Sequence, residues 1–105
     1  MIPGVEKGVP RTRLSEQEID QAIAEVAWSR RGDHIERTVV RPDFRAAVAL
    51  VNQVADLAEE LDHHPDMTIS WTRVALSVTT HDAGGLTALD FDLARRVDAL
   101  VEAVG

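Results

Sequence analysis

The chain has 105 residues, 45% of them apolar and 28% charged, which is the balance of one soluble globular domain. Its 18 acidic residues outnumber 11 Lys and Arg, and the net charge of −7 argues against a nucleic-acid partner, since such binding needs clustered positive charge. Cysteine is absent, which excludes disulfides, a thiolate nucleophile and zinc–sulfur sites. We find no signal-peptide pattern and no run of about 18 apolar residues, so we expect a cytoplasmic protein without a membrane partner.

The N-terminal segment differs from the rest of the chain. Residues 1–13 contain turn formers and no periodicity, so we predict a flexible arm there and a single domain over residues 14–105. The domain begins with a helix, because Ser15 and Glu18 have the spacing of a capping box. Apolar residues then recur at helical spacing for about three turns at Ile19, Ala22, Ile23 and Val26.

Four extended segments are expected to pair as two β-hairpins. The first hairpin covers residues 27–30 and 34–40, joined by a turn at residues 31–33. The second joins two strands tightly around Thr72-Arg73. Apolar side chains alternate with polar ones along its strands at Met67, Ile69, Trp71, Val74, Leu76 and Val78.

Two further helices complete the expected order of elements. The longest begins after Pro42-Asp43 and should end near residues 63–64, because Pro65 disfavours helical geometry in the residue before it. The predicted apolar stripe of this helix contains Phe44, Val48, Val51, Val54, Ala55, Ala58 and Leu61. Thr87, with Asp90 three residues later, caps the last helix.

The order α-β-β-α-β-β-α predicts an α+β fold, with a four-stranded antiparallel sheet and helices packed on one face. The chain is small, and its longest helix carries more apolar residues than one sheet face needs. We therefore expect a homodimer or homotetramer with helix faces in the interface.

Three of the four histidines lie at the ends of predicted elements: His63 and His64 after the long helix, and His81 after the last strand. Histidine exchanges protons near neutral pH, so these residues are candidates for general acid–base catalysis. Two structural interpretations compete with it: charge complementarity at a helix C-terminus for His63 and His64, and a loop hydrogen bond for His81. A metal site is a third interpretation, but adjacent helical residues point about a hundred degrees apart. We predict no metal and no cofactor.

Two acids and a tryptophan are candidate supporting residues. Glu59 lies four residues before His63, on the same face of a helix, so it is either a solvated carboxylate or a group that orients an imidazole or a ligand. Asp90 is explained by helix capping alone. Trp71 is most simply a core residue, although a tryptophan beside polar groups can also wall a flat heterocycle.

The spacing of these residues resembles the signature of the pterin-4a-carbinolamine dehydratases. The matching positions are Glu59, His63, His64, Pro65, Trp71, His81 and Asp90. Thr80–Thr87, Pro42-Asp43-Phe44 and Trp28 are also similar to that family, and the resemblance covers about residues 14–104. The segment after Pro65 is most similar to bacterial members.

The resemblance implies dehydration of 4a-hydroxytetrahydropterin to quinonoid dihydropterin, a step of tetrahydropterin recycling that needs no cofactor. It also implies that His63 and His81 are the acid–base pair and that His64 binds and orients the pterin. The supporting residues would be Glu59, Pro65, Trp71 and Asp90. The three histidines should then converge on one concave pocket.

One position departs from the family and one alternative function stays open. Many members have a polar or basic residue where this chain has Leu89, so a pterin contact would be missing and Leu89→Arg should leave activity unchanged or tighten binding. Some family-like proteins act as assembly factors or dimerisation partners. A non-catalytic binding or assembly module on the same scaffold is therefore the alternative.

Overall fold

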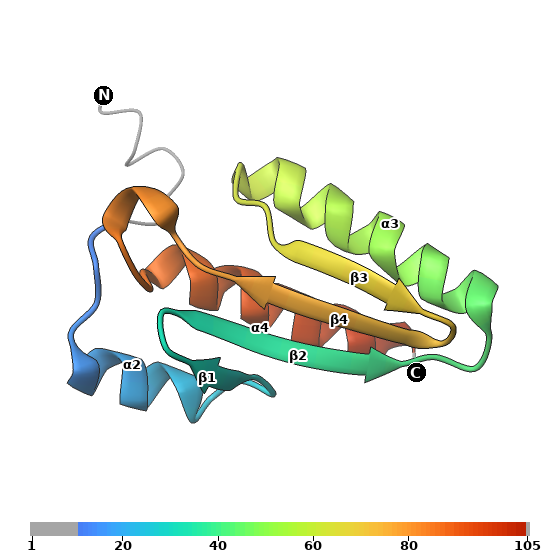
Figure 1. The fold of residues 1–105 in the computed structure, drawn as a ribbon, viewed down its shortest axis with the longest axis horizontal. Helices are drawn as coiled ribbons and strands as arrows, with labels where there is room; N and C mark the ends of the chain where they lie inside the picture. The colour runs from blue at the N-terminus through green and yellow to red at the C-terminus, as the bar shows by residue number, and fades with distance from the viewer. Residues whose placement is uncertain (1–10, 105) are drawn as a thin grey trace.

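The computed structural model describes residues 11–104 and has the predicted α+β architecture (Figure 1). The elements follow in the expected order: α2 (Glu16–Ile23), β1 (Ser29–Arg31), β2 (His34–Val40), α3 (Phe44–Leu61), β3 (Asp66–Ser70), β4 (Arg73–Val78), the 3₁₀ helix η1 (His81–Ala83) and α4 (Ala88–Val104). The four strands form one antiparallel sheet in the order β1-β2-β4-β3. The prediction of the fold class is confirmed.

The core lies between one face of the sheet and the helices. α4 crosses behind β2 and β4, and α3 runs alongside β3 in the opposite direction (Figure 1). Residues that alternate along β2 and β4 face this layer and are buried, which is the period-two pattern read in the sequence. These residues are Ile35, Val39, Val74, Leu76 and Val78.

Side-chain caps fix where the first two helices begin. The backbone N–H of Ser15 donates to Glu18, and the backbone N–H of Glu18 donates to the Ser15 hydroxyl, which confirms the capping box. These hydrogen bonds hold the pKa of the Glu18 carboxyl below its usual value. Asp43 caps α3 by accepting from the backbone N–H of Ala46 at 2.8 Å.

The predicted flexible arm falls mostly on residues 1–10, which lie outside the described residues. The described chain begins at Arg11, whose guanidinium donates to the Asp62 carbonyl. Arg13 forms an isolated antiparallel bridge with Thr87. Residues 11–13 therefore lie against the end of the sheet from which α4 begins.

The long helix differs from its prediction in two respects. It ends at Leu61, and Asp62 follows in the left-handed conformation (φ 51°), which stops the helix before Pro65 can act. The predicted apolar stripe of this helix includes Phe44, but the side chain of Phe44 is exposed. The buried face of the helix is therefore rotated relative to the predicted stripe. The side chains of α3 that face the core are those of Ala47, Leu50, Val54, Ala58 and Leu61.

The second hairpin also differs from its prediction. Its two-residue turn is Trp71-Thr72, one residue earlier than expected, and Ser70 pairs with Arg73 across it. Trp71 is therefore not a strand residue: it has a φ of 58°, and 81% of its surface is exposed. A left-handed backbone is uncommon for a bulky side chain.

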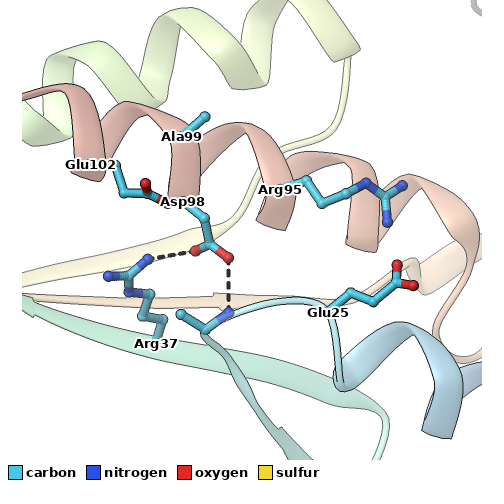
Figure 2. Close-up of a pocket in the computed structure, with 7 residues that line it drawn as sticks. Glu25, Arg37, Arg95, Asp98, Ala99 and Glu102 are labelled. Atoms are coloured by element: carbon cyan, nitrogen blue, oxygen red, sulfur yellow. Dashed lines mark hydrogen bonds and ion pairs between the residues drawn. The ribbon is translucent and has the colours of Figure 1, made fainter.

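An aspartate on α4 joins the helix layer to the first hairpin, at a hollow of about 490 Å³ (Figure 2). Asp98 accepts hydrogen bonds from the Ala27 backbone N–H and the Trp28 indole, both at 2.8 Å. It also pairs with Arg37 of β2 at 2.5 Å. Because both charged side chains are mostly buried, Asp98 holds α4 against β2 and the segment that leads into β1.

The position of Leu89 corrects the expectation for Leu89→Arg. Its side chain is 3% exposed and belongs to the hydrophobic core. An arginine there has to bury a guanidinium or displace the first turn of α4. Leu89 is thus explained by packing.

We expect Leu89→Arg to lower the free energy of unfolding by about 3 kcal/mol or more, because a buried, unpaired charge is among the most costly substitutions. Leu89→Met is the matched control and should cost less than about 1.5 kcal/mol. Urea unfolding followed by circular dichroism measures both. Equal stability of the arginine variant and the parent would contradict the packing role.

We expect Asp98→Ala to lower the free energy of unfolding by about 2–4 kcal/mol, since it leaves the Trp28 indole and the Arg37 guanidinium without their partner. Asp92→Ala is the matched control on the same helix. Asp92 is similarly buried and pairs with Arg96 at 3.5 Å, so its loss should cost about 1 kcal/mol or less. Thermal unfolding compares the two variants, and an equal loss in both would argue against the special role of Asp98.

Candidate functional site

The imidazole of His63 is buried against a carboxylate. The left-handed residue Asp62 turns the chain, and the backbone N–H of His63 donates to the Ala58 carbonyl at 3.0 Å. The side chain thereby enters the protein and is 7% exposed. Its Nε2 lies 2.6 Å from Oδ1 of Asp90. Since an ionised carboxylate only accepts, Nε2 carries the hydrogen and Nδ1 is the nitrogen that can take up a proton.

Asp90 is fully buried at the start of α4, and both of its oxygens have partners. Its Oδ2 accepts from the Thr87 backbone N–H and from the Thr80 hydroxyl, each at 2.8 Å. The two threonine hydroxyls are 2.9 Å apart. The predicted pairing of Thr87 with Asp90 at the helix start is confirmed, but the carboxylate also joins α3, β4 and α4.

His64 lies on the surface beside Glu59. Its Nε2 is 2.6 Å from Oε2 of Glu59, and both side chains are exposed. The helical spacing of Glu59 and His63 suggested that these two would share a face. That spacing does not apply, because the helix ends at Leu61 and the chain reverses at Asp62. Adjacent histidines therefore have different carboxylate partners.

His81 is the first residue of η1 and is exposed. The Thr80 carbonyl before it accepts from the backbone N–H groups of Ala83 and Gly85, which fixes the turn. The His81 imidazole has no hydrogen bond to any residue in the range 11–104 and can meet a ligand. The hydroxyl of Thr80 bonds to Asp90, so one carboxylate links the His63 ring to the residue that precedes His81.

The two remaining candidates lie at opposite ends of β3. Pro65 is half-buried between His64 and the start of the strand. Trp71 follows the end of the strand, at the far tip of the β3–β4 hairpin from the histidines (Figure 1). Within one chain, the structure thus brings Pro65 to the histidine end and does not bring Trp71 there.

The sequence reasoning gave no site role to Thr80 and gave Thr87 a capping role only. Thr80 and Thr87 are both buried, and both bond to Asp90 or to each other. A polar residue just after an apolar strand and another at a helix start are common signals for caps and turns. The Thr80 hydroxyl donates to the Asp90 carboxylate, and the Thr87 hydroxyl contacts Thr80 and accepts from the Leu89 backbone N–H.

Two other kinds of feature are absent from the described part of the chain. No group of three or more His, Asp or Glu side chains within residues 11–104 is arranged to hold a metal ion. Over the same residues, no helix combines the length and the apolar character that crossing a membrane requires.

Curated relatives match this chain over most of their length. A protein of Roseiflexus sp. (strain RS-1) is 50% identical over 91 residues, which cover 86% of this chain and 98% of that protein. A protein of Nocardia farcinica (strain IFM 10152) is 49% identical over 88 residues, covering 83% and 93%. Both are named, provisionally, pterin-4-alpha-carbinolamine dehydratase.

Two solved structures are similar to this fold. A protein from Brucella melitensis, described as a transcriptional coactivator/pterin dehydratase, has a TM-score of 0.82 at 33% identity and covers 86% of this chain and 99% of its own. A pterin dehydratase-like protein, described as a RuBisCO assembly factor in the alpha-carboxysome, has a TM-score of 0.59 and covers 72% and 88%. At 21% identity, the second likeness concerns the fold alone.

The sequence pattern of one family matches nearly the whole described chain. It covers residues 12–100, which include all three histidines, Glu59 and Asp90, and it carries the description Pterin 4 alpha carbinolamine dehydratase. Together with the sequence identities of the curated relatives, this match is decisive. The chain belongs to the pterin 4 alpha carbinolamine dehydratase family.

Proposed function

We propose that this protein dehydrates 4a-hydroxytetrahydropterin to quinonoid dihydropterin at the end of the sheet where His63, His64 and His81 lie. The observation that carries the proposal is the buried pairing of His63 with Asp90, whose other oxygen binds the residue before His81. The reaction releases one water and transfers no electrons. It therefore needs a proton donor and a proton acceptor, which two imidazoles can provide.

His63 is the proposed base. Its Nε2–H is engaged by Asp90, which fixes the orientation of the ring and the tautomer, so that Nδ1 is left to accept a proton. In the proposed step, Nδ1 removes the proton from a ring nitrogen of the pterin. The electron pair of that N–H bond moves into the ring as the bond between C4a and the hydroxyl breaks.

His81 is the proposed acid. The leaving hydroxyl takes a proton from the imidazolium of His81 and departs as water. An exposed histidine without a partner among residues 11–104 can be reprotonated by solvent after each turnover. The proton taken by His63 returns to solvent in the same interval, so that atoms and charge balance over the cycle.

His64 and Glu59 are proposed to bind the pterin at the rim of the site. Their hydrogen bond is 2.6 Å long and lies at the surface, next to Pro65. A carboxylate of this kind can accept hydrogen bonds from the amino and ring N–H groups of a pterin. These contacts are proposed to stabilise the bound substrate and the transition state to a similar extent, so their loss should change mainly KM.

A binding or assembly module on the same scaffold is the alternative function. The similar structure described as a RuBisCO assembly factor shows that this fold serves such a role in another protein. The buried pairing of His63 with Asp90 favours the enzyme, because a surface-binding role does not need an imidazole held on a carboxylate. A coupled assay with synthetic 4a-hydroxytetrahydropterin and a dihydropterin reductase decides between them: no acceleration over the spontaneous reaction would favour the module.

We expect His63→Ala and His81→Ala each to lower kcat by about ten- to a thousandfold, because one positioned acid or base contributes about 10²–10⁴ in rate and the reaction also proceeds spontaneously. The double variant should fall to the uncatalysed rate. Stopped-flow absorbance measures the rates, and circular dichroism checks the fold. Full activity in both folded single variants would show that the acid–base assignment is wrong.

We expect His64→Ala to raise KM several-fold and to change kcat less, because His64 is proposed to orient substrate and not to transfer protons. Glu59→Gln should act in the same direction. Glu60→Gln is its matched control, since Glu60 is a neighbouring exposed carboxylate of α3 without a histidine partner among the described residues. A large fall in kcat at constant KM would instead place His64 in the proton-transfer step.

A further inference from the structure

A short segment ahead of α2, residues 11–14, lies against the turn that joins β4 to α4 (Figure 1). The backbone N–H of Leu14 donates to the Leu86 carbonyl at 2.9 Å. Arg13 pairs with Thr87 in an isolated antiparallel bridge. These contacts bring Arg13 to the end of the sheet where the histidines lie.

The side chain of Arg13 points to the same face of this turn as two buried hydroxyls. Residues that lie opposite each other in an antiparallel bridge project to one face, so Arg13 and Thr87 share a face. The Thr87 hydroxyl is 2.9 Å from that of Thr80, which donates to the carboxylate of Asp90. Arg13 therefore lies on the face of the turn that carries Asp90 and, through it, the imidazole of His63.

Gly85 leaves the space that this side chain occupies. A Cβ atom at Gly85 would lie 3.0 Å from Nε and 3.5 Å from Cζ of Arg13. The φ of the preceding residue, Gly84, is 72°, a value that itself favours glycine, whereas Gly85 has no such positive φ. The backbone conformation therefore does not require a glycine at position 85, and the close approach of the arginine side chain explains it.

The same segment also reaches the turn that carries the other two histidines. The guanidinium of Arg11 donates to the Asp62 carbonyl at 3.2 Å, directly before His63. The guanidinium of Arg13 has no hydrogen bond or ion pair within residues 11–104, and its side chain is exposed. Arg11 is thus engaged by the protein, whereas Arg13 offers its N–H groups to a ligand at the histidine end.

The groups already proposed for the site leave one atom of the pterin without a partner. A pterin presents amino and ring N–H groups, from which Glu59 is proposed to accept, and beside them the carbonyl oxygen at C4, next to the reacting carbon C4a. In the proposed step Nδ1 of His63 accepts a proton, and His81 gives its proton to the leaving hydroxyl. None of these groups is left to donate to the carbonyl oxygen. A guanidinium carries five N–H donors and keeps its charge in proteins.

We infer that Arg13 donates a hydrogen bond to the C4 carbonyl oxygen of the pterin, and that the site therefore selects pteridines with a carbonyl at C4. This contact rests on the proposed function and narrows its substrate class. A carboxylate at the ring N–H groups and a guanidinium at the neighbouring oxygen together fix the rotation of the ring in its plane. The hydroxyl at C4a is thereby held towards the histidines.

The binding of two stable ligands separates this contact from a structural role of Arg13. The first ligand, 7,8-dihydrobiopterin, has the C4 carbonyl, and its 2,4-diamino analogue has an amino group in that place. We expect Arg13→Ala to weaken binding of the carbonyl ligand about ten- to a hundredfold, as is usual when a hydrogen bond to a charged donor is lost. Binding of the diamino analogue should be nearly unchanged, and Arg13→Lys should fall between the parent and Arg13→Ala. Isothermal titration calorimetry measures the affinities.

Two control variants locate the effect at the guanidinium of Arg13. Arg11→Ala removes the same charge two residues away and should leave the ratio of the two affinities unchanged. Gly85→Ala keeps the arginine but adds a methyl group 3.0 Å from its Nε, which displaces the guanidinium. It should lower the preference for the carbonyl ligand in the parent and have no further effect on Arg13→Ala.

The inference and the proposed function fail in different ways. Equal weakening of both ligands by Arg13→Ala, or an equal change of the ratio in Arg11→Ala, overturns the contact. A parent that dehydrates 4a-hydroxytetrahydropterin but whose preference does not depend on Arg13 refutes the contact and leaves the proposed function standing. A parent that neither binds 7,8-dihydrobiopterin nor accelerates the dehydration refutes both.

Discussion

The buried carboxylate of Asp90 is the constraint on which the histidine end of this protein depends. A buried charged group without hydrogen-bond partners lowers the stability of the folded protein by several kcal/mol. The three donors come from the end of α3, the end of β4 and the start of α4. The contacts from His63 and Thr80 therefore tie the end of α3 and the end of β4 to the start of α4, and they hold the imidazole of His63 in place.

A second aspartate, Asp98, has the corresponding role two turns further along α4. Its partners come from the first hairpin and the segment before it, whereas the partners of Asp90 come from the second half of the chain. The helix is thus attached to the sheet by two polar contacts with apolar packing between them. Directional contacts of this kind set the rotation of a helix on a sheet more narrowly than apolar packing alone.

Much of the fold could be predicted because its signals are local. The capping box at Ser15, the start of the long helix after Pro42-Asp43 and the alternation in β2 and β4 involve residues a few positions apart, and the structure confirms them. The errors arose where backbone geometry changes at a single residue. The left-handed conformation of Asp62 changed the partner of Glu59, and that of Trp71 moved a presumed strand residue into a turn.

The candidate site could be predicted only in part, for a different reason. The types and spacing of the histidines indicated proton chemistry, but their partners lie far away in sequence. His63 meets Asp90 across 27 positions, and Trp28 meets Asp98 across 70. Such contacts depend on how the layers pack, and no periodic pattern in the sequence reports them. At Leu89 the resemblance to the family suggested that a pterin contact is missing. The structure shows instead that this side chain packs in the core.

Because the chain reverses at Asp62, the adjacent histidines His63 and His64 differ in which substitutions they tolerate. His63 points inward, where any replacement has to fit the space and the charge beside it. His64 points outward, where a replacement has space and changes only the chemistry of the surface that a ligand meets. Random substitutions at the first position are therefore limited by packing and by the proposed proton transfer, and those at the second almost entirely by what the protein binds.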